Sequence, residues 1–220
     1  MKVIAGMATT NARKEFAHRA AESIYKQVTD IYIHNNDSYV DRADNGKYWA
    51  AFIYQKEPIY YLTLDDDIIY PQGYVDNMLY QIEKHKCIVS HHGRVLQGLT
   101  KDVGDYYTGH KAYAFFQENK QEIQLDVFGD GVAGYRTDYF NPKDMPFEKR
   151  LCMSDTLVSL EMWKQGKKAV LLTHGKYHIK PQRVPAHLTI SGTRETRSKE
   201  KNSIADEIYA LKKELYLPKN

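Results

Sequence analysis

The chain has 220 residues, of which 42% are hydrophobic and 27% are charged, and its formal net charge is +3. This composition excludes a disordered or fibrous protein and is enough for one domain with a substantial core. The small net charge gives no support for nucleic-acid binding. Two cysteines, Cys87 and Cys152, provide neither a disulfide framework nor a cysteine metal site, so we expect a reducing compartment.

The sequence also lacks the signals of a membrane or secreted protein. No apolar run reaches the roughly 18 residues that a membrane span requires, and the N-terminus does not resemble a signal peptide. We therefore expect a cytoplasmic protein without a transmembrane segment. The basic C-terminal region leaves peripheral association with a membrane surface open.

The first 37 residues predict a β-α-β unit. Residues 3–7 and 31–33 have the short apolar runs of buried strands, and Phe16, Ala20 and Ile24 between them recur at helical spacing. A short helix is predicted over 47–54. The polar groups Thr9-Thr10 and Asp37 follow the two strands directly.

The middle of the chain continues the alternation of strands and helices. A third strand is predicted at 59–64, followed by a helix whose apolar stripe contains Val75, Met78, Leu79 and Ile82. Further strands are predicted at 87–90, 112–116 and 123–128. Residues 91–112, rich in Gly, His and Tyr, predict a long loop.

The last part of the chain predicts two helices and one strand. Ser154 is the expected N-cap of a helix over 155–165, and residues 168–172 predict a buried strand. The segment 173–200 is basic and contains Pro and Gly. Ser203 and Asp206 resemble a capping box that opens a C-terminal helix. The whole pattern predicts a single-domain α/β/α sandwich over 1–200 with a mixed, mostly parallel sheet, on which a helix over 201–220 packs.

Three consecutive carboxylates, Asp65, Asp66 and Asp67, end the third predicted strand. Three adjacent like charges repel one another, so the cluster is favourable mainly when a cation or many hydrogen-bond donors sit on it, and a solvated acidic turn is the alternative. Mg²⁺ and Mn²⁺ prefer oxygen ligands and commonly take one or two carboxylates together with phosphate oxygens. Ligands of such sheets bind at the carboxyl ends of the strands. The triplet therefore predicts a divalent-metal site that carries a phosphorylated ligand.

The segment 60–71, with the sequence YYLTLDDDIIYP, resembles the Asp-x-Asp segment of GT-A-fold glycosyltransferases, and most of all the inverting, family 2-like group. The resemblance implies a GT-A, Rossmann-like fold and a nucleotide-diphosphate sugar as donor, with a UDP-sugar favoured. It also implies a Mn²⁺ or Mg²⁺ ion held by Asp67 and Asp65, and nucleotide-sugar contacts from Asp65 and Asp66.

Shorter matches extend the resemblance along the chain. Thr9, within 3–13, resembles the family's first nucleotide-contact loop, and Asp37 stands where the family contacts the base or ribose. Asp44 and Lys47 resemble a segment beside the uracil, ribose and diphosphate, although a polar turn and a solvated helix start explain them equally well. Asp130, in the glycine-rich stretch 129–136, is implied to contact the donor sugar, and a simple turn is the alternative.

Asp155 falls where the family places its catalytic base. An inverting transfer needs one carboxylate to take the proton of the acceptor hydroxyl. Ser154 occupies the place of the first of the family's two acidic residues, so this chain departs from the pattern there. The alternative role for Asp155 is to complement the dipole at the helix N-terminus.

His174 follows the last predicted strand and resembles the histidine that many GT-A enzymes use as a further metal ligand. His178 is the second choice, and an ordinary surface histidine is the alternative.

The resemblance therefore implies a metal-dependent hexosyltransferase-type enzyme that moves a sugar to an acceptor hydroxyl of a glycan or glycoconjugate, with inversion. A sugar-phosphate nucleotidyltransferase is an alternative, ranked lower because no Gly-rich, basic phosphate loop follows the first strand. A non-catalytic nucleotide-sugar or glycan-binding domain of the same fold is a second alternative. The sequence identifies neither the sugar nor the acceptor.

Overall fold

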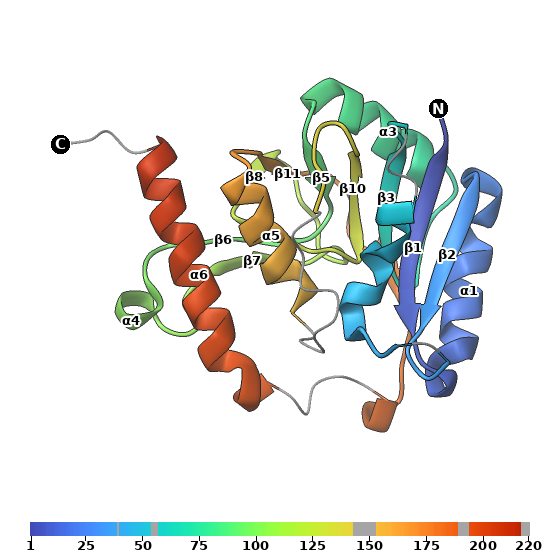
Figure 1. The fold of residues 1–220 in the computed structure, drawn as a ribbon, viewed down its shortest axis with the longest axis horizontal. Helices are drawn as coiled ribbons and strands as arrows, with labels where there is room; N and C mark the ends of the chain where they lie inside the picture. The colour runs from blue at the N-terminus through green and yellow to red at the C-terminus, as the bar shows by residue number, and fades with distance from the viewer. Residues whose placement is uncertain (39, 54–56, 143–152, 189–193, 217–220) are drawn as a thin grey trace.

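A computed structural model describes the chain apart from residues 39, 54–56, 143–152, 189–193 and 217–220, so part of the predicted basic segment 173–200 lies outside the described residues. Its centre is a seven-stranded sheet (Figure 1). In spatial order the strands are β2 (Asp30–Asn35), β1 (Val3–Thr9), β3 (Tyr60–Asp65), β10 (Val132–Arg136), β5 (Ile88–Ser90), β11 (Ala169–Leu171) and β8 (Ile123–Leu125).

The sheet is mixed and mostly parallel. Strands β1, β2, β3, β5 and β11 run in one direction, whereas β10 and β8 run against their neighbours. The predicted β-α-β unit is confirmed, because β1 and β2 pair in parallel and α1 (Lys14–Ile24) connects them. The predicted α/β class with a mixed, mostly parallel sheet is confirmed as well.

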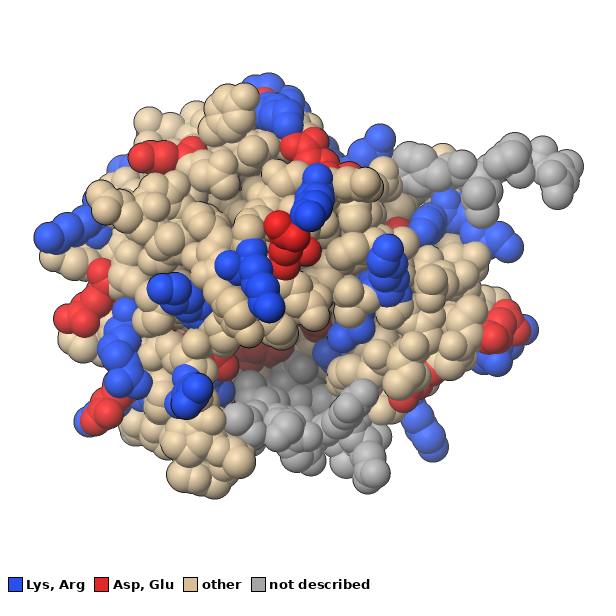
Figure 2. All heavy atoms as spheres, turned by 180° about the vertical axis from the view of Figure 1, so that it is seen from behind, with Lys and Arg blue, Asp and Glu red and all other residues tan. Residues whose placement is uncertain are grey.

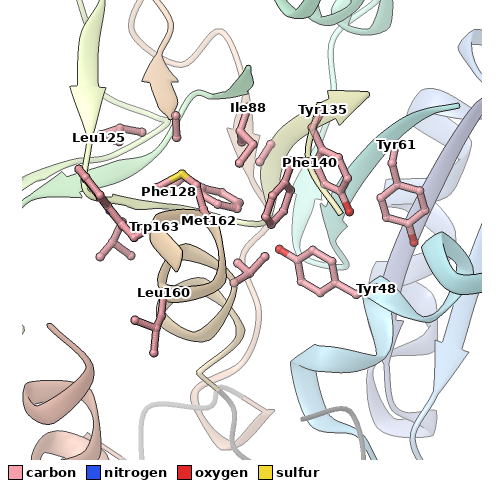
Figure 3. Packing of buried hydrophobic residues seen from close by; sticks show 14 of the residues in the cluster. Tyr48, Tyr61, Ile88, Leu125, Phe128, Tyr135, Phe140, Leu160, Met162 and Trp163 are labelled. Carbon is pink, nitrogen blue, oxygen red and sulfur yellow. The ribbon is translucent and has the colours of Figure 1, made fainter. Parts of the chain in front are cut away.

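Apolar side chains cover both faces of the sheet, because successive residues of a strand point to opposite sides. Ala5 and Leu62 face one core cluster, which α1 and α3 (Tyr74–His85) complete, whereas Ile4 and Tyr61 face the other. The second cluster includes residues of η3 (Ala43–Tyr48), α2 (Trp49–Ile53), α5 (Ser154–Lys164) and α6 (Arg194–Tyr216). Figure 3 shows its large rings, among them Tyr48, Tyr61, Tyr135, Phe140 and Trp163.

The middle of the chain differs from the expectation of a long loop and two plain strands. Residues 91–112 include β6 (Gly93–Val95) and α4 (Thr100–Val103), and the strand predicted at 112–116 is instead β7 (Lys111–Tyr113). The strand predicted at 123–128 is divided between two sheets, because β8 ends at Leu125 and β9 (Val127–Phe128) joins β6 and β7. Asp126 marks the break: its buried carboxylate accepts the Leu96 N–H at 2.7 Å.

Two predicted helix starts are wrong. Ser154 is the first residue of α5 and does not cap it, since its hydroxyl donates to Asp44 at 2.8 Å. Helix α6 begins at Arg194, well before the proposed capping box at Ser203. Asp206 does not cap its own helix but accepts hydrogen bonds from the amide and hydroxyl of Thr100, at 2.6 and 2.9 Å. Long-range bonds of this kind outweigh the local capping signal.

The remaining elements of the fold are short. A two-stranded sheet joins β4 (Ile68–Ile69) to β12 (Lys180–Pro181), and single-turn helices occur at η1 (Asn11–Arg13), η2 (Tyr25–Gln27) and η4 (Ala186–Leu188). Within the described ranges, no helix has the length and apolar character needed to cross a bilayer.

The order of the first three strands defines a switch point of the sheet. Strand β1 lies between β2 and β3. The chain therefore passes from β1 to β2 on one side of β1, and it later returns as β3 to pair with the other side of β1. Open α/β sheets bind ligands outside the carboxyl ends of strands at such a switch point. Here Ala8 of β1 is paired with Asp65 of β3, which brings the end of β1 beside the carboxylate triplet.

Candidate functional site

Asp65 is the last residue of β3, and a buried tyrosine holds the turn that follows it. The Tyr70 hydroxyl accepts the Asp65 N–H at 2.9 Å and donates to the Gly131 carbonyl at 2.6 Å. Gly131 leaves room for the Asp65 carboxylate, because a Cβ at this position would overlap it and displace it. Tyr70 and Gly131 therefore fix where the triplet begins.

Asp66 is the buried member of the triplet. Its carboxylate accepts a hydrogen bond from the Thr9 hydroxyl at 2.7 Å and pairs with the guanidinium of Arg13. Burial raises the pKa of Asp66 to about 6 in spite of these two partners. Thr9 and the triplet thus come together as predicted, but in this structure Thr9 supports Asp66.

Asp67 is partly exposed, like Asp65, with 40% of its side chain accessible. Arg13 donates to its Oδ2 at 2.9 Å, so a single guanidinium bridges Asp66 and Asp67. Partial burial, and next the charge of Asp65, raises the pKa of Asp67. Of the two carboxylates that Arg13 bridges, Asp67 is the one that remains accessible to a ligand from solvent.

Lys47 lies between two carboxylates and is only 3% exposed. Its ammonium group pairs with Asp65 and lies 3.3 Å from Oδ1 of Asp130. The Tyr48 hydroxyl donates to the other Asp130 oxygen at 3.3 Å. Burial raises the pKa of Asp130 to about 7, although Lys47 opposes the shift. The predicted residues Lys47, Asp65 and Asp130 therefore form one cluster.

The charges of this cluster do not balance. When ionised, the four carboxylates Asp65, Asp66, Asp67 and Asp130 face two cationic side chains, Arg13 and Lys47. An excess of two negative charges remains, which matches one divalent cation. Asp67 and Asp65, with 40% and 39% of their side chains exposed, are the members that can supply oxygen ligands.

Asp44 and Asp37 make different contacts from those of the triplet. Asp44 accepts hydrogen bonds from the Ser154 amide at 3.0 Å and the Ser154 hydroxyl at 2.8 Å, so it fastens the N-terminus of α5. Burial raises the pKa of Asp44. Asp37 is exposed, and its carboxylate accepts the Asn11 N–H at 2.6 Å. Their predicted nucleotide contacts stay predictions.

Asp155 stands in the first turn of α5 with 28% of its side chain exposed. The Tyr106 hydroxyl donates to its Oδ2 at 3.0 Å, and the Lys201 ammonium lies 3.2 Å from its Oδ1. Burial favours the protonated form, but Lys201, Tyr106 and the Thr156 amide outweigh it and hold the pKa of Asp155 below its usual value. Asp155 is therefore ionised at neutral pH.

His174 is buried beside another histidine. Its Nδ1 lies 2.9 Å from the Leu172 carbonyl, which it can reach only as a donor, so Nε2 carries the lone pair. The ring of His91 lies edge-on at 5.2 Å, and burial, together with His174 and His178, lowers the pKa of His91 to about 3. Among the described residues, no three His, Cys, Asp or Glu side chains are grouped as metal ligands. A role for His174 beside Asp67 and Asp65 stays a prediction.

Several residues of the site were missed from the sequence, namely Arg13, Tyr70, Tyr106 and Lys201. Arg13 follows the strand-end threonines closely, and this position is the one local signal for it. The others contact partners that only the fold brings near. The β1 and β3 arrows of Figure 1 point toward the lower edge, and Figure 2 shows a hollow at that edge with acidic atoms on its wall.

Comparison with known proteins assigns no family to this arrangement. No family model matches the chain, and no curated protein matches it.

Proposed function

We propose that this protein is a metal-dependent glycosyltransferase of the GT-A type. It would move a sugar from a nucleotide-diphosphate sugar, with a UDP-sugar favoured, to a hydroxyl of a glycan or glycoconjugate. The observation that carries the proposal is the placement of Asp65, Asp66 and Asp67 at the switch point of the sheet beside Asp130, where these four carboxylates, when ionised, exceed the charges of Arg13 and Lys47 by two. An anionic diphosphate is repelled by such a cluster unless a cation accompanies it.

The residues of the triplet fit a Mn²⁺ or Mg²⁺ ion. Asp67 and Asp65 would hold it through their exposed carboxylate oxygens. When bound, such an ion neutralises the charge that develops on the leaving nucleoside diphosphate. Asp66 stays bonded to Thr9 and Arg13 and supports the turn, so its contribution is to position the other two carboxylates.

Asp155 supplies the base in this proposal. Its carboxylate is ionised at neutral pH and is partly exposed, so it can accept the proton of an acceptor hydroxyl. Attack of that oxygen on the anomeric carbon from the side opposite the nucleotide inverts the configuration. Asp44, through Ser154, holds the helix terminus on which Asp155 stands.

A second candidate function is a nucleotide-sugar-binding domain without turnover. It is favoured by one observation, namely that both oxygens of Asp155 are already bonded, to Tyr106 and to Lys201.

The test is incubation with Mn²⁺ and a panel of nucleotide sugars, with measurement of nucleoside diphosphate release. Release that Asp155→Asn reduces by about 10² to 10⁴-fold, with donor affinity retained, supports the transferase. Binding without release supports the binding domain. Formation of nucleoside triphosphate from pyrophosphate identifies a nucleotidyltransferase. The absence of both binding and release for every nucleotide sugar of the panel refutes all three functions.

A further inference from the structure

The C-terminal helix supplies a buried cation to Asp155. Lys201 lies on α6, which packs along α5 (Figure 1), and its side chain is only 9% exposed. Its ammonium group lies 3.2 Å from Oδ1 of Asp155 and 5.1 Å from the centre of the Tyr106 ring. A buried lysine requires partners for its charge, and here Asp155 and the aromatic ring provide them.

Tyr106 holds the second oxygen of the same carboxylate. The residue is 1% exposed, and its hydroxyl donates to Oδ2 of Asp155 at 3.0 Å. The guanidinium carbon of Arg94 lies 4.8 Å from the centre of the Tyr106 ring, and the Tyr106 N–H donates to Asn202 of α6 at 2.8 Å. Tyr106 is thereby fixed between the domain and α6.

Independent contacts dock α6 on the domain. Lys212 donates to the buried carboxylate of Asp126 at 2.7 Å, and Asp206 accepts two hydrogen bonds from Thr100. These bonds lie away from Asp155, so Lys201 is not needed merely to attach the helix. Its contact with Asp155 calls for an explanation of its own.

We propose that Lys201 and Tyr106 are positioning residues that hold Asp155 as an oriented carboxylate, so that α6 is part of the active site. The inference rests on the proposed function. Oδ1 accepts from Lys201 and from the Thr156 N–H, at 2.9 Å for the latter, and Oδ2 accepts from Tyr106, which leaves one lone pair of Oδ2 for the acceptor hydroxyl. The geometry restricts the rotation of the carboxylate in the way a base needs.

The charges around Asp155 explain why two donors are required. Burial and the carboxylates of Asp44 and Asp130 disfavour its ionised form, and His92 is held neutral by its own burial. Lys201 is the cation that opposes these effects directly, and Tyr106 adds a hydrogen bond. Loss of Lys201 therefore raises the pKa of Asp155 and moves the acid limb of a kcat profile to higher pH.

The test compares Lys201→Met with Lys212→Met in the full chain. Both changes remove one lysine charge of α6 and one salt bridge to an aspartate, but only the first touches Asp155. We expect Lys201→Met to lower kcat at neutral pH by about ten-fold or more, with donor KM unchanged, and to move the acid limb upward. Lys201→Arg should restore most of the activity, and Tyr106→Phe should lower kcat without removing the charge.

A measurement that does not need turnover separates this inference from the proposed function. Carboxyl NMR titration, with the Asp155 signal assigned from Asp155→Asn, should give a higher Asp155 pKa in Lys201→Met than in Lys212→Met. Equal titration of Asp155 in the two variants overturns the inference, as does an equal loss of kcat. If the wild-type protein transfers no sugar, the proposed function fails, and the titration still decides whether Lys201 keeps Asp155 ionised.

Discussion

Substitution of Gly131 by alanine tests how closely the Asp65 carboxylate packs against the backbone at Gly131. The Cβ of Gly131→Ala would lie 2.0 Å from Oδ2 of Asp65, so that carboxylate must retreat by about 1.4–2 Å to reach ordinary van der Waals separation. This displacement breaks the hydrogen bond between the Asp65 carboxylate and the buried ammonium group of Lys47. A hydrogen bond to a charged group contributes about 1.5–3 kcal/mol to the free energy of unfolding. Because Asp65 is partly exposed, we expect its loss to cost about 1–2 kcal/mol.

This loss is measurable by thermal unfolding. For a chain of this size, about 1–2 kcal/mol lowers the Tm by about 2–8 °C. Gly175→Ala is the matched control, since it is the same substitution at a glycine with nothing within 4 Å of the added Cβ. The control also accounts for the effect of alanine on the unfolded chain.

A double mutant identifies the contact. In an Asp65→Ala background the added methyl group has no carboxylate to displace, so Gly131→Ala should cost little there, with a coupling of about 1–2 kcal/mol. If Gly131→Ala unfolds within about 1 °C of Gly175→Ala, or if the coupling is absent, the described packing of Asp65 against Gly131 is wrong.

Three further predictions concern the same cluster. Asp67→Ala should abolish Mn²⁺-dependent binding of UDP in calorimetry, and retained binding would show that the ion is held elsewhere. His174→Ala should weaken Mn²⁺ binding, and unchanged affinity would redirect that role to His178. Because the pKa of Asp130 is raised to about 7, its folded form keeps a proton that the unfolded chain releases above about pH 4. Stability should therefore fall as pH rises from about 4 to about 7, and Asp130→Asn should flatten this fall in Tm, whereas an unaltered slope would contradict the raised pKa.

The sequence predicts those parts of the site that lie at strand ends. An apolar run that stops at Asp65 fixes both the strand and the carboxylates after it, and the same holds for Thr9. Parallel pairing of β1 with β3 then brings the two together, as expected for the carboxyl ends of neighbouring strands. Here local pattern and topology agree, so the prediction is confirmed.

The prediction fails where a distant partner decides the local structure. Ser154 has the sequence signal of an N-cap, yet Asp44, 110 positions away, takes its hydroxyl and its amide. Residues 123–128 have the composition of one strand, yet Asp126 turns its carboxylate toward the Leu96 amide and Lys212 and divides them. Such bonds reverse a local preference because each of them satisfies a buried polar group.

The sequence pattern does not identify Arg13 and Lys201 as site residues, because their partners are also distant in the chain. Arg13 is 53 positions from Asp66, and Lys201 is 46 positions from Asp155. Each stands in a helical segment where a basic residue ordinarily faces solvent, so periodicity gives no sign of burial.

The two halves of the site differ in their charge balance. Asp155 has its own buried cation, Lys201, and so it can stay ionised with no ligand present. When ionised, the triplet and Asp130 have two negative charges beyond what Arg13 and Lys47 supply, and burial raises the pKa values of Asp66, Asp67 and Asp130. Only the triplet half therefore gains from an added divalent cation. This division matches the two tasks of the proposed reaction, since a base must be ionised before its substrate arrives, whereas a diphosphate can bring its cation with it.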